Sequence, residues 1–440
     1  MHSGVPRPAR RRRRGQGSRH RRDGGARAGR NLLMTIARRL APLLLLLGAC
    51  AKREAALPRS VAPTDEEIWI IARAGETSGR TSTPHAPRML AGTTPDATPL
   101  ALERTDVQAT VIGPFAALRV RQIYAGPERA TEGAFVLPLP AAAVFHDLVV
   151  TLGRRHIRAI VRAREEAEAI YAAALRSGRV ASLLREEDGV VLGMAHLPPR
   201  TPIHVEFSYA ETMPWRDGAW ELVVPRLPGG TVGARIDLDG LGPITTVESP
   251  THAIRQTTDS GEQTSVVLRE PATLRDADFV LRYAVDAHAS PGAVVVSSGS
   301  RGTVAALVLH PIAAGGRPTA LHLAAIDWGT LVVEDVPASN AAVNFSVPEG
   351  RPLVLRARVL GGTPGTVRVT TLVGGRRRTR TFTAVAAPAE AVDLLPVLWA
   401  SDAVRALWPD RDAMRDLALR YGVLSPVTAL VAVDATAPSE

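Results

Sequence analysis

The residue with the most specific chemistry in this sequence is Cys50, the single cysteine of the 440-residue chain. Its thiol has no second cysteine with which to form a disulfide inside the monomer. It closes the run Leu47-Gly48-Ala49-Cys50, and Arg38 and Arg39 precede the apolar stretch 40–47. Positive charge, an apolar run and small residues in this order are typical of a secretory signal peptide. The apolar run is much shorter than the roughly twenty residues of a membrane-spanning helix.

This order also resembles the lipobox of bacterial lipoproteins, in which Leu47, Gly48 and Ala49 would precede the modified Cys50. The resemblance implies cleavage before Cys50, a diacylglycerol on its sulfur, and a fatty acid such as palmitate on the new amino group. Ala51 resembles the signal for delivery to the outer membrane. We therefore expect a lipoprotein of the cell envelope, held by its lipid anchor on the periplasmic or surface face of that membrane. A plain secretory signal with an incidental cysteine is the alternative.

The formal charge of +10 belongs to the N-terminal extension. Residues 1–30 hold eleven arginines and one aspartate, which account for the whole excess, and residues 51–440 are close to neutral. Met34 lies ahead of Arg38 and would begin a signal of ordinary length. We therefore expect no nucleic-acid partner. An arginine-rich arm that binds nucleic acid is the alternative interpretation of the extension.

The remaining candidates for chemistry are sparse. The pair His146-Asp147 is the best start for an active site, but such a pair at the end of a strand more often belongs to a turn. The eleven histidines are scattered without the spacing of zinc ligands, so we expect no metal and no cofactor. We expect no enzyme; an envelope hydrolase with an unrecognised Ser/His site is the alternative.

The elements that would position these residues follow from periodicity. Residues 1–49 are a basic extension and signal peptide, and 50–99 are a tether that contains one short strand at 67–73. Alternation of apolar and polar residues then predicts strands, each with one buried face. These strands are expected at 106–113, 117–124, 133–139, 147–152, 157–161, 180–185, 190–197, 203–209 and 220–225. Residues 163–177 are the one amphipathic helix of this half, with glutamates in the first turns and Gly178 as C-cap.

Residues 100–228 resemble the VIT domain, the module shared by vault proteins and inter-alpha-trypsin inhibitor heavy chains. The resemblance rests on the order and spacing of several short runs. They are Asp106-Val107, Gly113, Val120 to Tyr124, Gly133 to Pro140, Gly153-Arg154, Arg164-Glu165, Ala169 with Tyr171, Ala173-Ala174, Gly178, Ala181 with Leu183-Leu184, Pro198-Pro199, and Val205-Glu206 with Tyr209. The family's module is structural, so the resemblance implies a β-sandwich-like domain and no catalytic residues.

In bacterial relatives a von Willebrand A domain usually follows, with a D-x-S-x-S metal site. The nearest string here is Val296-Ser297-Ser298-Gly299-Ser300, in which Val296 replaces the aspartate. Valine offers no oxygen to a hard cation. We therefore expect no divalent cation at such a site. Residues 276–283 and 305–311 resemble the strands that precede the A domain in the family, and 326–328 and 351–354 resemble the segment that follows it. The resemblance thus implies an A domain absent near residues 311–325, where the loop 313–318 would mark its removal.

The second half reads as another β-sandwich-like domain at 236–385, followed by a C-terminal region at 386–440 with helices and a strand. Residues 391–408 and 412–421 are the expected helices, with Trp399, Leu407, Trp408 and Leu417 in the core. Arg376, Arg377, Arg378 and Arg380 follow the turn Gly374-Gly375. They are interpreted as guards of a sheet edge, and binding of an anionic polymer is the alternative.

The fold class is thus mainly β with α additions. The expected function is that of a non-catalytic, membrane-anchored lipoprotein. It would act as a binding or assembly scaffold in the cell envelope through its VIT domain. Its partner would be an envelope protein or polysaccharide.

Overall fold

The alternating segments form strands that bury their apolar side. The computed structural model describes residues 70–74, 86–92, 97–138, 142–169, 190–226, 229–259, 263–270, 277–314, 317–334 and 345–434. In β4 (Leu102–Ile112) and β5 (Phe115–Tyr124) the expected alternation is confirmed, with Val107, Ala109 and Leu118 buried. Gly113 joins the two strands at φ +49°, a left-handed conformation that glycine adopts without strain.

The largest sheet of the described part has fourteen strands, in the order β15-β16-β13-β4-β5-β10-β7-β8-β28-β1-β9-β6-β2-β3. Besides β4 and β5, its members are β1 (Ile70–Ala74), β2 (Arg88–Ala91), β3 (Thr98–Pro99), β6 (Thr131–Leu137), β7 (Val144–Leu152), β8 (Arg155–Ala163), β9 (Val190–Leu197), β10 (Ile203–Thr212), β13 (Thr231–Asp239), β15 (Ile254–Asp259), β16 (Gln263–Leu268) and β28 (Thr428–Asp434). The strands expected from 133 to 209 are confirmed as β6 to β10, except the one at 180–185, which lies outside the described residues.

The two halves of this sheet face each other across an aromatic core. The ring of Phe135 in β6 lies 6.2 Å from that of Tyr124 in β5 and 5.9 Å from that of Phe207 in β10, measured between ring centroids. All three side chains are buried. Because β6 is remote from β5 and β10 in the strand order, these contacts place one half of the sheet over the other.

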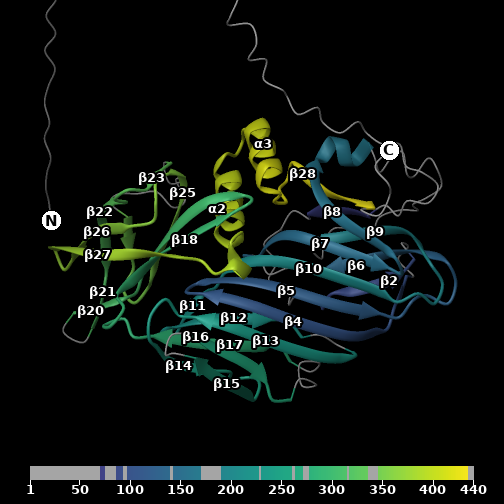
Figure 1. The fold of residues 1–440 in the computed structure, drawn as a ribbon, viewed down its shortest axis with the longest axis horizontal. Helices are drawn as coiled ribbons and strands as arrows, with labels where there is room; N and C mark the ends of the chain where they lie inside the picture. The colour runs from purple at the N-terminus through teal and green to yellow at the C-terminus, as the bar shows by residue number, and fades with distance from the viewer. Residues whose placement is uncertain are drawn as a thin grey trace, which may run out of the picture. The chain divides into compact units, whose positions relative to one another are not determined.

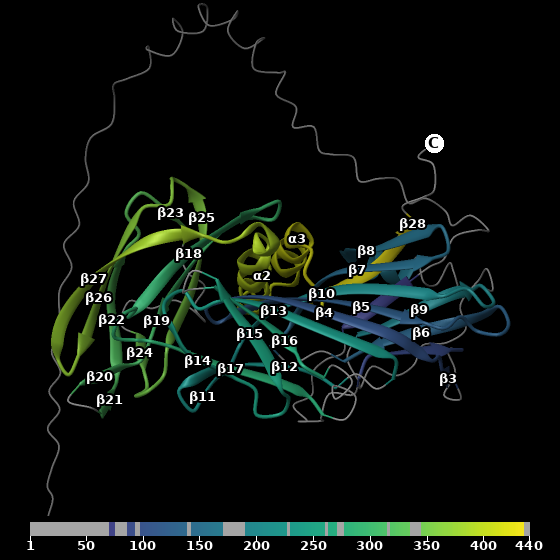
Figure 2. The ribbon, with the colours of Figure 1, turned by 60° about the horizontal axis from the view of Figure 1, so that its bottom comes forward.

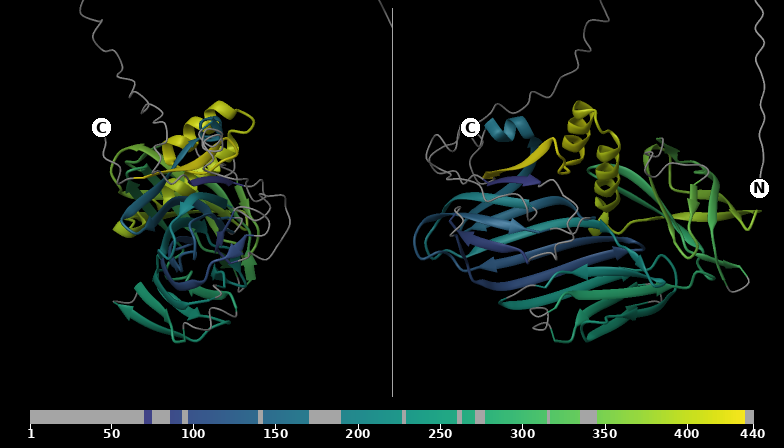
Figure 3. Two further views of the ribbon diagram at one scale, coloured as in Figure 1. Left: turned by 90° about the vertical axis from the view of Figure 1, so that its right-hand side faces the viewer. Right: turned by 180° about the vertical axis from the view of Figure 1, so that it is seen from behind.

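Strands from distant parts of the sequence complete the sheet. β28 pairs antiparallel with β8 on one side and with β1 on the other, so that Val431 lies between Ile160 and Ile71. Figure 3 shows the yellow β28 beside the purple β1. β13 pairs in parallel with β4. The sheet thus continues past residue 228, and the domain limits at 228, 236 and 385 stay predictions.

Three smaller sheets complete the β structure (Figure 1). The four-stranded sheet holds β11 (Trp215–Arg216), β12 (Ala219–Val224), β17 (Phe279–Val285) and β14 (Ile244–Glu248). The eight-stranded sheet holds β23 (Val332–Val333), β25 (Leu353–Gly361), β19 (Gly302–Leu309), β18 (Gly292–Gly299), β27 (Arg376–Ala386), β26 (Thr366–Val373), β22 (Leu321–Asp327) and β24 (Phe345–Val347). The chain is therefore mainly β, as expected.

A two-stranded hairpin lies between β19 and β22 in the sequence. It consists of β20 (Ile312–Ala314) and β21 (Arg317–Thr319), and Ala314 pairs with Arg317. Residues 313, 314, 317 and 318, which were expected in a loop, therefore lie in paired strands. The removal of an A domain at this point stays a prediction.

The helices are few. Residues 164–169 are helical, and the rest of the helix expected at 163–177 lies outside the described residues. A 3-10 turn (Ala389–Ala391) leads into α2 (Leu394–Ala406) and α3 (Arg411–Tyr421). The carboxylate of Asp410 accepts a hydrogen bond from Ala413 N at 3.0 Å, and Gly422 ends α3 at φ +60°. Both are favourable caps, which explains why α3 begins and ends there.

The expected core of the C-terminal helices is partly wrong. Trp399 is buried, and Leu407 and Leu417 are half-buried, but Trp408 is 63% exposed. α2 ends at Ala406, so Trp408 lies in the turn before α3 and not on the inward face of a longer helix. The helix expected over 391–408 therefore reaches two residues beyond the end of α2.

Candidate functional site

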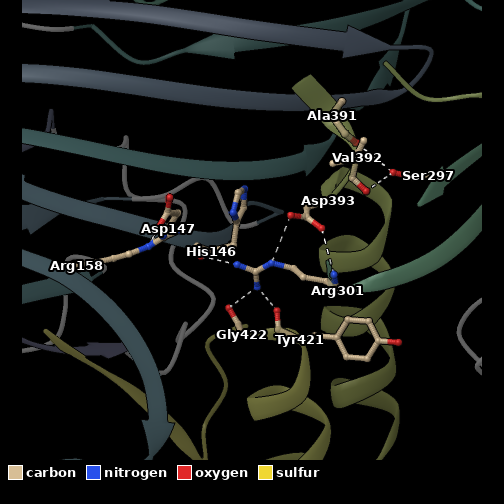
Figure 4. A network of polar contacts seen from close by, with 10 residues as sticks. All are labelled: His146, Asp147, Arg158, Ser297, Arg301, Ala391, Val392, Asp393, Tyr421 and Gly422. Atoms are coloured by element: carbon tan, nitrogen blue, oxygen red, sulfur yellow. Dashed lines mark hydrogen bonds and ion pairs between the residues drawn. The ribbon is translucent and has the colours of Figure 1, made fainter. Parts of the chain in front are cut away.

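Arg301 joins three parts of the chain (Figure 4). It lies in the turn between β18 and β19, and its guanidinium donates to the main-chain oxygens of Tyr421, Gly422 (3.2 Å) and His146 (3.2 Å). Its main-chain N–H donates to Asp393 at 3.4 Å. The carbonyls at the end of α3 lack helical partners, so the cation binds where the helix dipole is negative. Its side chain also forms an ion pair with Asp393 at 3.9 Å, so one residue holds β7, the start of α2 and the end of α3 together.

Arg356 is a second residue that links separate parts of the chain. From β25 it donates to the hydroxyl of Thr212 in β10 at 2.7 Å and forms an ion pair with Asp402 in α2. Its guanidinium also lies 5.7 Å from the ring centroid of Phe115 in β5. The residue is 8% exposed. This buried cation ties the eight-stranded sheet to α2 and to the large sheet.

The structure separates His146 from Asp147. Asp147 accepts from Arg158 on the neighbouring strand at 3.2 Å. Burial, and then the charges of Arg301 and Arg119, lower the pKa of His146 to about 3. Such an imidazole is a weak base near neutral pH. Among the described side chains, no hydroxyl makes a hydrogen bond with this ring.

Two serines of the run 297–300, Ser297 and Ser298, make structural hydrogen bonds. Val296 is 5% exposed, in the core. The Ser297 hydroxyl donates to Val392 O at 2.6 Å, with Ala391 O at 3.1 Å, and so positions the start of α2. The Ser298 hydroxyl lies 2.9 Å from that of Thr303 across the hairpin. No group of three or more His, Cys, Asp or Glu side chains suited to a metal occurs in the described ranges.

A groove lies between α2, α3 and the β25 side of the eight-stranded sheet, with a volume of about 530 Å³. Its apolar lining is formed by Trp399, Ala403, Ala406, Leu407, Ala413 and Leu417, and its charged lining by Glu334, Arg358, Asp416 and Arg420. This volume lies within the usual range of ligand sites, and an apolar surface with a few polar groups is typical of them.

The polar groups of the groove have defined positions. Arg358 forms an ion pair with Glu334 at 2.9 Å, and its guanidinium lies 5.8 Å from the ring centroid of Trp399. The buried indole N–H of Trp399 has no hydrogen-bond partner among the residues that the structure describes. The groove can therefore hold a compact apolar group, with the Arg358–Glu334 ion pair and the charges of Asp416 and Arg420 around it.

Sequence reasoning did not find this groove, because its lining comes from four separate segments. It also did not find Glu211 and His310. Burial raises the pKa of Glu211 to about 7 and lowers that of His310 to about 4, and both ring nitrogens of His310 lack partners within the described part. No local pattern marks either residue.

The expected lipidation site lies outside the described residues. This holds for Cys50 and for Leu47, Gly48 and Ala49. Within the parts of the chain that are described, no helix is both long and apolar enough to cross a membrane.

Comparison with known proteins identifies the first β region. Residues 102–209 match the family model of the vault protein inter-alpha-trypsin (VIT) domain, so the expected resemblance is confirmed there and the chain carries a VIT domain. No curated protein sequence matches the chain.

Two solved structures resemble parts of the chain. One is a candidate nutrient-binding protein from Legionella pneumophila subsp. pneumophila strain Philadelphia 1, with 8% identity, a TM-score of 0.27, and coverage of 46% of this chain and 72% of that one. The other is a candidate protease from Parabacteroides distasonis ATCC 8503, with 10% identity, a TM-score of 0.23, and coverage of 44% and 40%. Likeness at this level carries no functional argument.

Proposed function

We propose that this protein is a non-catalytic, membrane-anchored lipoprotein that serves as a binding or assembly scaffold in the cell envelope through its VIT domain. The observation that carries the proposal is the VIT domain at 102–209, a module that suggests protein binding. The lipobox around Cys50 supports the anchor and the envelope location. The partner would be an envelope protein or polysaccharide.

The packing of the chain supports a scaffold role. Arg301 and Arg356 tie the VIT strands to α2, α3 and the eight-stranded sheet through buried polar contacts. The sandwich-like pairing of the two facing halves of the large sheet is part of the proposal. Such cross-linked β layers present fixed surfaces, which lowers the ordering cost of binding.

Two surfaces are the candidates for contact. On the VIT domain, Arg119 and Arg121 flank Glu206 at 3.5 and 2.6 Å, and both arginines are about half exposed. The second candidate surface is the groove lined by Trp399. Exposed charges on a sheet steer partners, whereas a groove accepts an apolar anchor.

The test is cross-linking in intact membranes that carry the full-length protein. The Arg119→Glu/Arg121→Glu variant reverses charge on the VIT surface, and Ala406→Arg places a long side chain in the groove. Glu248→Arg on exposed β14 is the matched control. We expect the VIT variant to lose at least about three-quarters of the adducts formed by the wild type, and the control to keep them. Equal adducts from the wild type and the VIT variant would contradict a role for the VIT surface.

A further inference from the structure

The first part of β27 has an unpaired side. β27 pairs with β26 over residues 376–383, and with β18 only at residues 384–386. Over residues 376–383, no described strand and no described backbone hydrogen bond occupies the side away from β26. Figure 2 shows the β26–β27 hairpin at the left-hand margin, directed away from α2 and α3. The hairpin therefore presents a strand edge of about eight residues.

The register shows which main-chain groups face outward. Ala384 N donates to Gly365 O at 2.8 Å, so 384 and 365 are a hydrogen-bonded pair. Such pairs alternate with non-hydrogen-bonded ones in an antiparallel ladder. The N–H and C=O groups of Arg377, Thr379, Thr381 and Thr383 therefore point away from β26. The 3.0 Å contact between the Thr379 and Thr370 hydroxyls fits the closer spacing of a non-hydrogen-bonded pair.

The charged side chains along residues 376–383 of β27 are all positive. Arg376, Arg378 and Arg380 lie on one face of β27 and Arg377 on the other, and no carboxylate in the described part forms an ion pair with any of the four. Burial and the charge of Arg378 lower the pKa of Arg380, as expected for neighbouring cations without a counter-ion. Strand geometry spaces the three same-face arginines by about 7 Å.

We propose that residues 376–383 of β27 accept an acidic, extended segment of a partner protein as an added strand. The outward main-chain groups would pair with the segment, and its alternate carboxylates would face Arg376, Arg378 and Arg380. The same charges oppose pairing with a second copy of this edge, because identical strands would place arginine next to arginine. Edge β15 differs, since it carries both Arg255 and Asp259.

This proposal rests on β27 and not on the VIT domain. It adds a partner chemistry to the proposed scaffold, and it can fail while the VIT-dependent adducts persist. The loss of those adducts would likewise leave the β27 edge untouched.

The test is fluorescence anisotropy of the full-length protein with a dye-labelled peptide of alternating glutamate and valine, about eight residues long. Alternation places every glutamate on one face of a strand. A glutamate–proline peptide keeps the charge but lacks half of the N–H groups. We expect the glutamate–valine peptide to bind and the proline peptide to bind at least about tenfold more weakly.

Three variants separate pairing from charge. Arg376→Gln/Arg378→Gln changes exposed residues and should weaken binding of the peptide roughly tenfold. Thr381→Pro removes an outward N–H and should weaken binding without unfolding, whereas Thr381→Val should bind like the wild type. The basic residues 1–30 are common to all samples, so binding of the peptides to them adds the same background to every measurement.

Several results would overturn the proposal. They are equal binding of the two peptides, unchanged binding after the double arginine substitution, or unchanged binding after Thr381→Pro. Heparin binding that depends on the arginines while the glutamate–valine peptide does not bind would indicate a polyanion site instead. Dimers in sedimentation that Thr381→Pro dissociates would indicate self-pairing.

Discussion

Single buried side chains hold this fold together, and Arg356 gives the clearest test. Its ion pair with Asp402 has side-chain exposures of 9% and 19%, whereas the Arg368–Asp327 pair has 65% and 58%. Removing one partner of a buried pair leaves an uncompensated charge and costs about 3 kcal/mol or more, while an exposed pair contributes about 0–1 kcal/mol. We expect Arg356→Met to destabilise the protein by about 3 kcal/mol in chemical denaturation, and Arg368→Met by less than about 1 kcal/mol. Equal losses of stability in the two variants would contradict the role of Arg356 as a buried link between the eight-stranded sheet, α2 and the large sheet.

Because the folded protein disfavours protonation of His310, the free energy of unfolding should decrease as the pH falls. Its pKa is about 4 in the folded protein and 6.5 ordinarily. Between these values the unfolded chain binds a proton that the folded chain does not, so stability is lost as pH falls from about 6.5 to 4. The full effect is on the order of 3 kcal/mol. The free energy of unfolding of His310→Leu, measured relative to the wild type in denaturant titrations, should therefore increase steadily as the pH falls from about 6.5 to 4.

Glu211 should act in the opposite sense and serves as the control. Its pKa is raised from 4.5 to about 7, so the folded protein keeps a proton that the unfolded chain releases. Stability from this group is present below pH 4.5 and is lost as pH rises toward 7. The advantage of Glu211→Gln over the wild type should grow in that direction. The same pH trend for both variants would contradict these burial assignments.

At the scale of elements, β28 is an interior strand of the large sheet that joins the C-terminal end of the described chain to β1 and β8. It has partners on both sides, whereas β15 is an edge strand. Arg269 N donates to Ala253 O, so by alternation the N–H of Gln256 points away from β16. Val431→Pro should therefore lower the melting temperature by at least about 8 °C, and Gln256→Pro by less than about 2 °C. A mild effect of Val431→Pro would show that β28 is dispensable.

Local patterns predicted elements better than their partners. Alternation located β4, β5 and β9, because a half-buried strand must alternate wherever it lies. It could not show that β28 enters the sheet between β8 and β1, because nothing local encodes a pairing across several hundred residues. The end of α2 was misjudged for a related reason: Trp408 fits helical spacing but follows the last helical residue.

The candidate site also shows that local sequence patterns identify single residues and short runs, but not the contacts between distant segments. The sequence drew attention to His146, Asp147 and the serines at 297–300. The structure places the side chains of Asp147, Ser297 and Ser298 in polar contacts, and the main-chain oxygen of His146 accepts from Arg301. The groove was missed because Glu334, Arg358, Trp399 and Arg420 meet only through packing of α2 and α3 beside β25. The arginines of β27 follow the turn at Gly374-Gly375, on a strand edge that no described strand covers over residues 376–383. Their interpretation as guards of a sheet edge stays a prediction.

At the scale of the whole molecule, the proposed scaffold would need the proposed anchor to stay at the envelope. A VIT domain tied to the C-terminal sheet offers fixed surfaces, and a lipid on Cys50 would hold them at the envelope. A single acyl chain binds membranes weakly, so the diacylglycerol together with the amide-linked fatty acid would be needed for stable anchoring. Loss of the anchor should leave the fold intact and remove the protein from the membrane fraction.

The most direct measurement is metabolic labelling with a fatty-acid probe, followed by fractionation of the cells. The wild type and an Ala51→Ser variant should carry the probe and sediment with membranes. Cys50→Ser should lose both the probe and the membrane association, because no other cysteine is available. Equal labelling of the wild type and Cys50→Ser would contradict the central claim of a lipid-anchored scaffold.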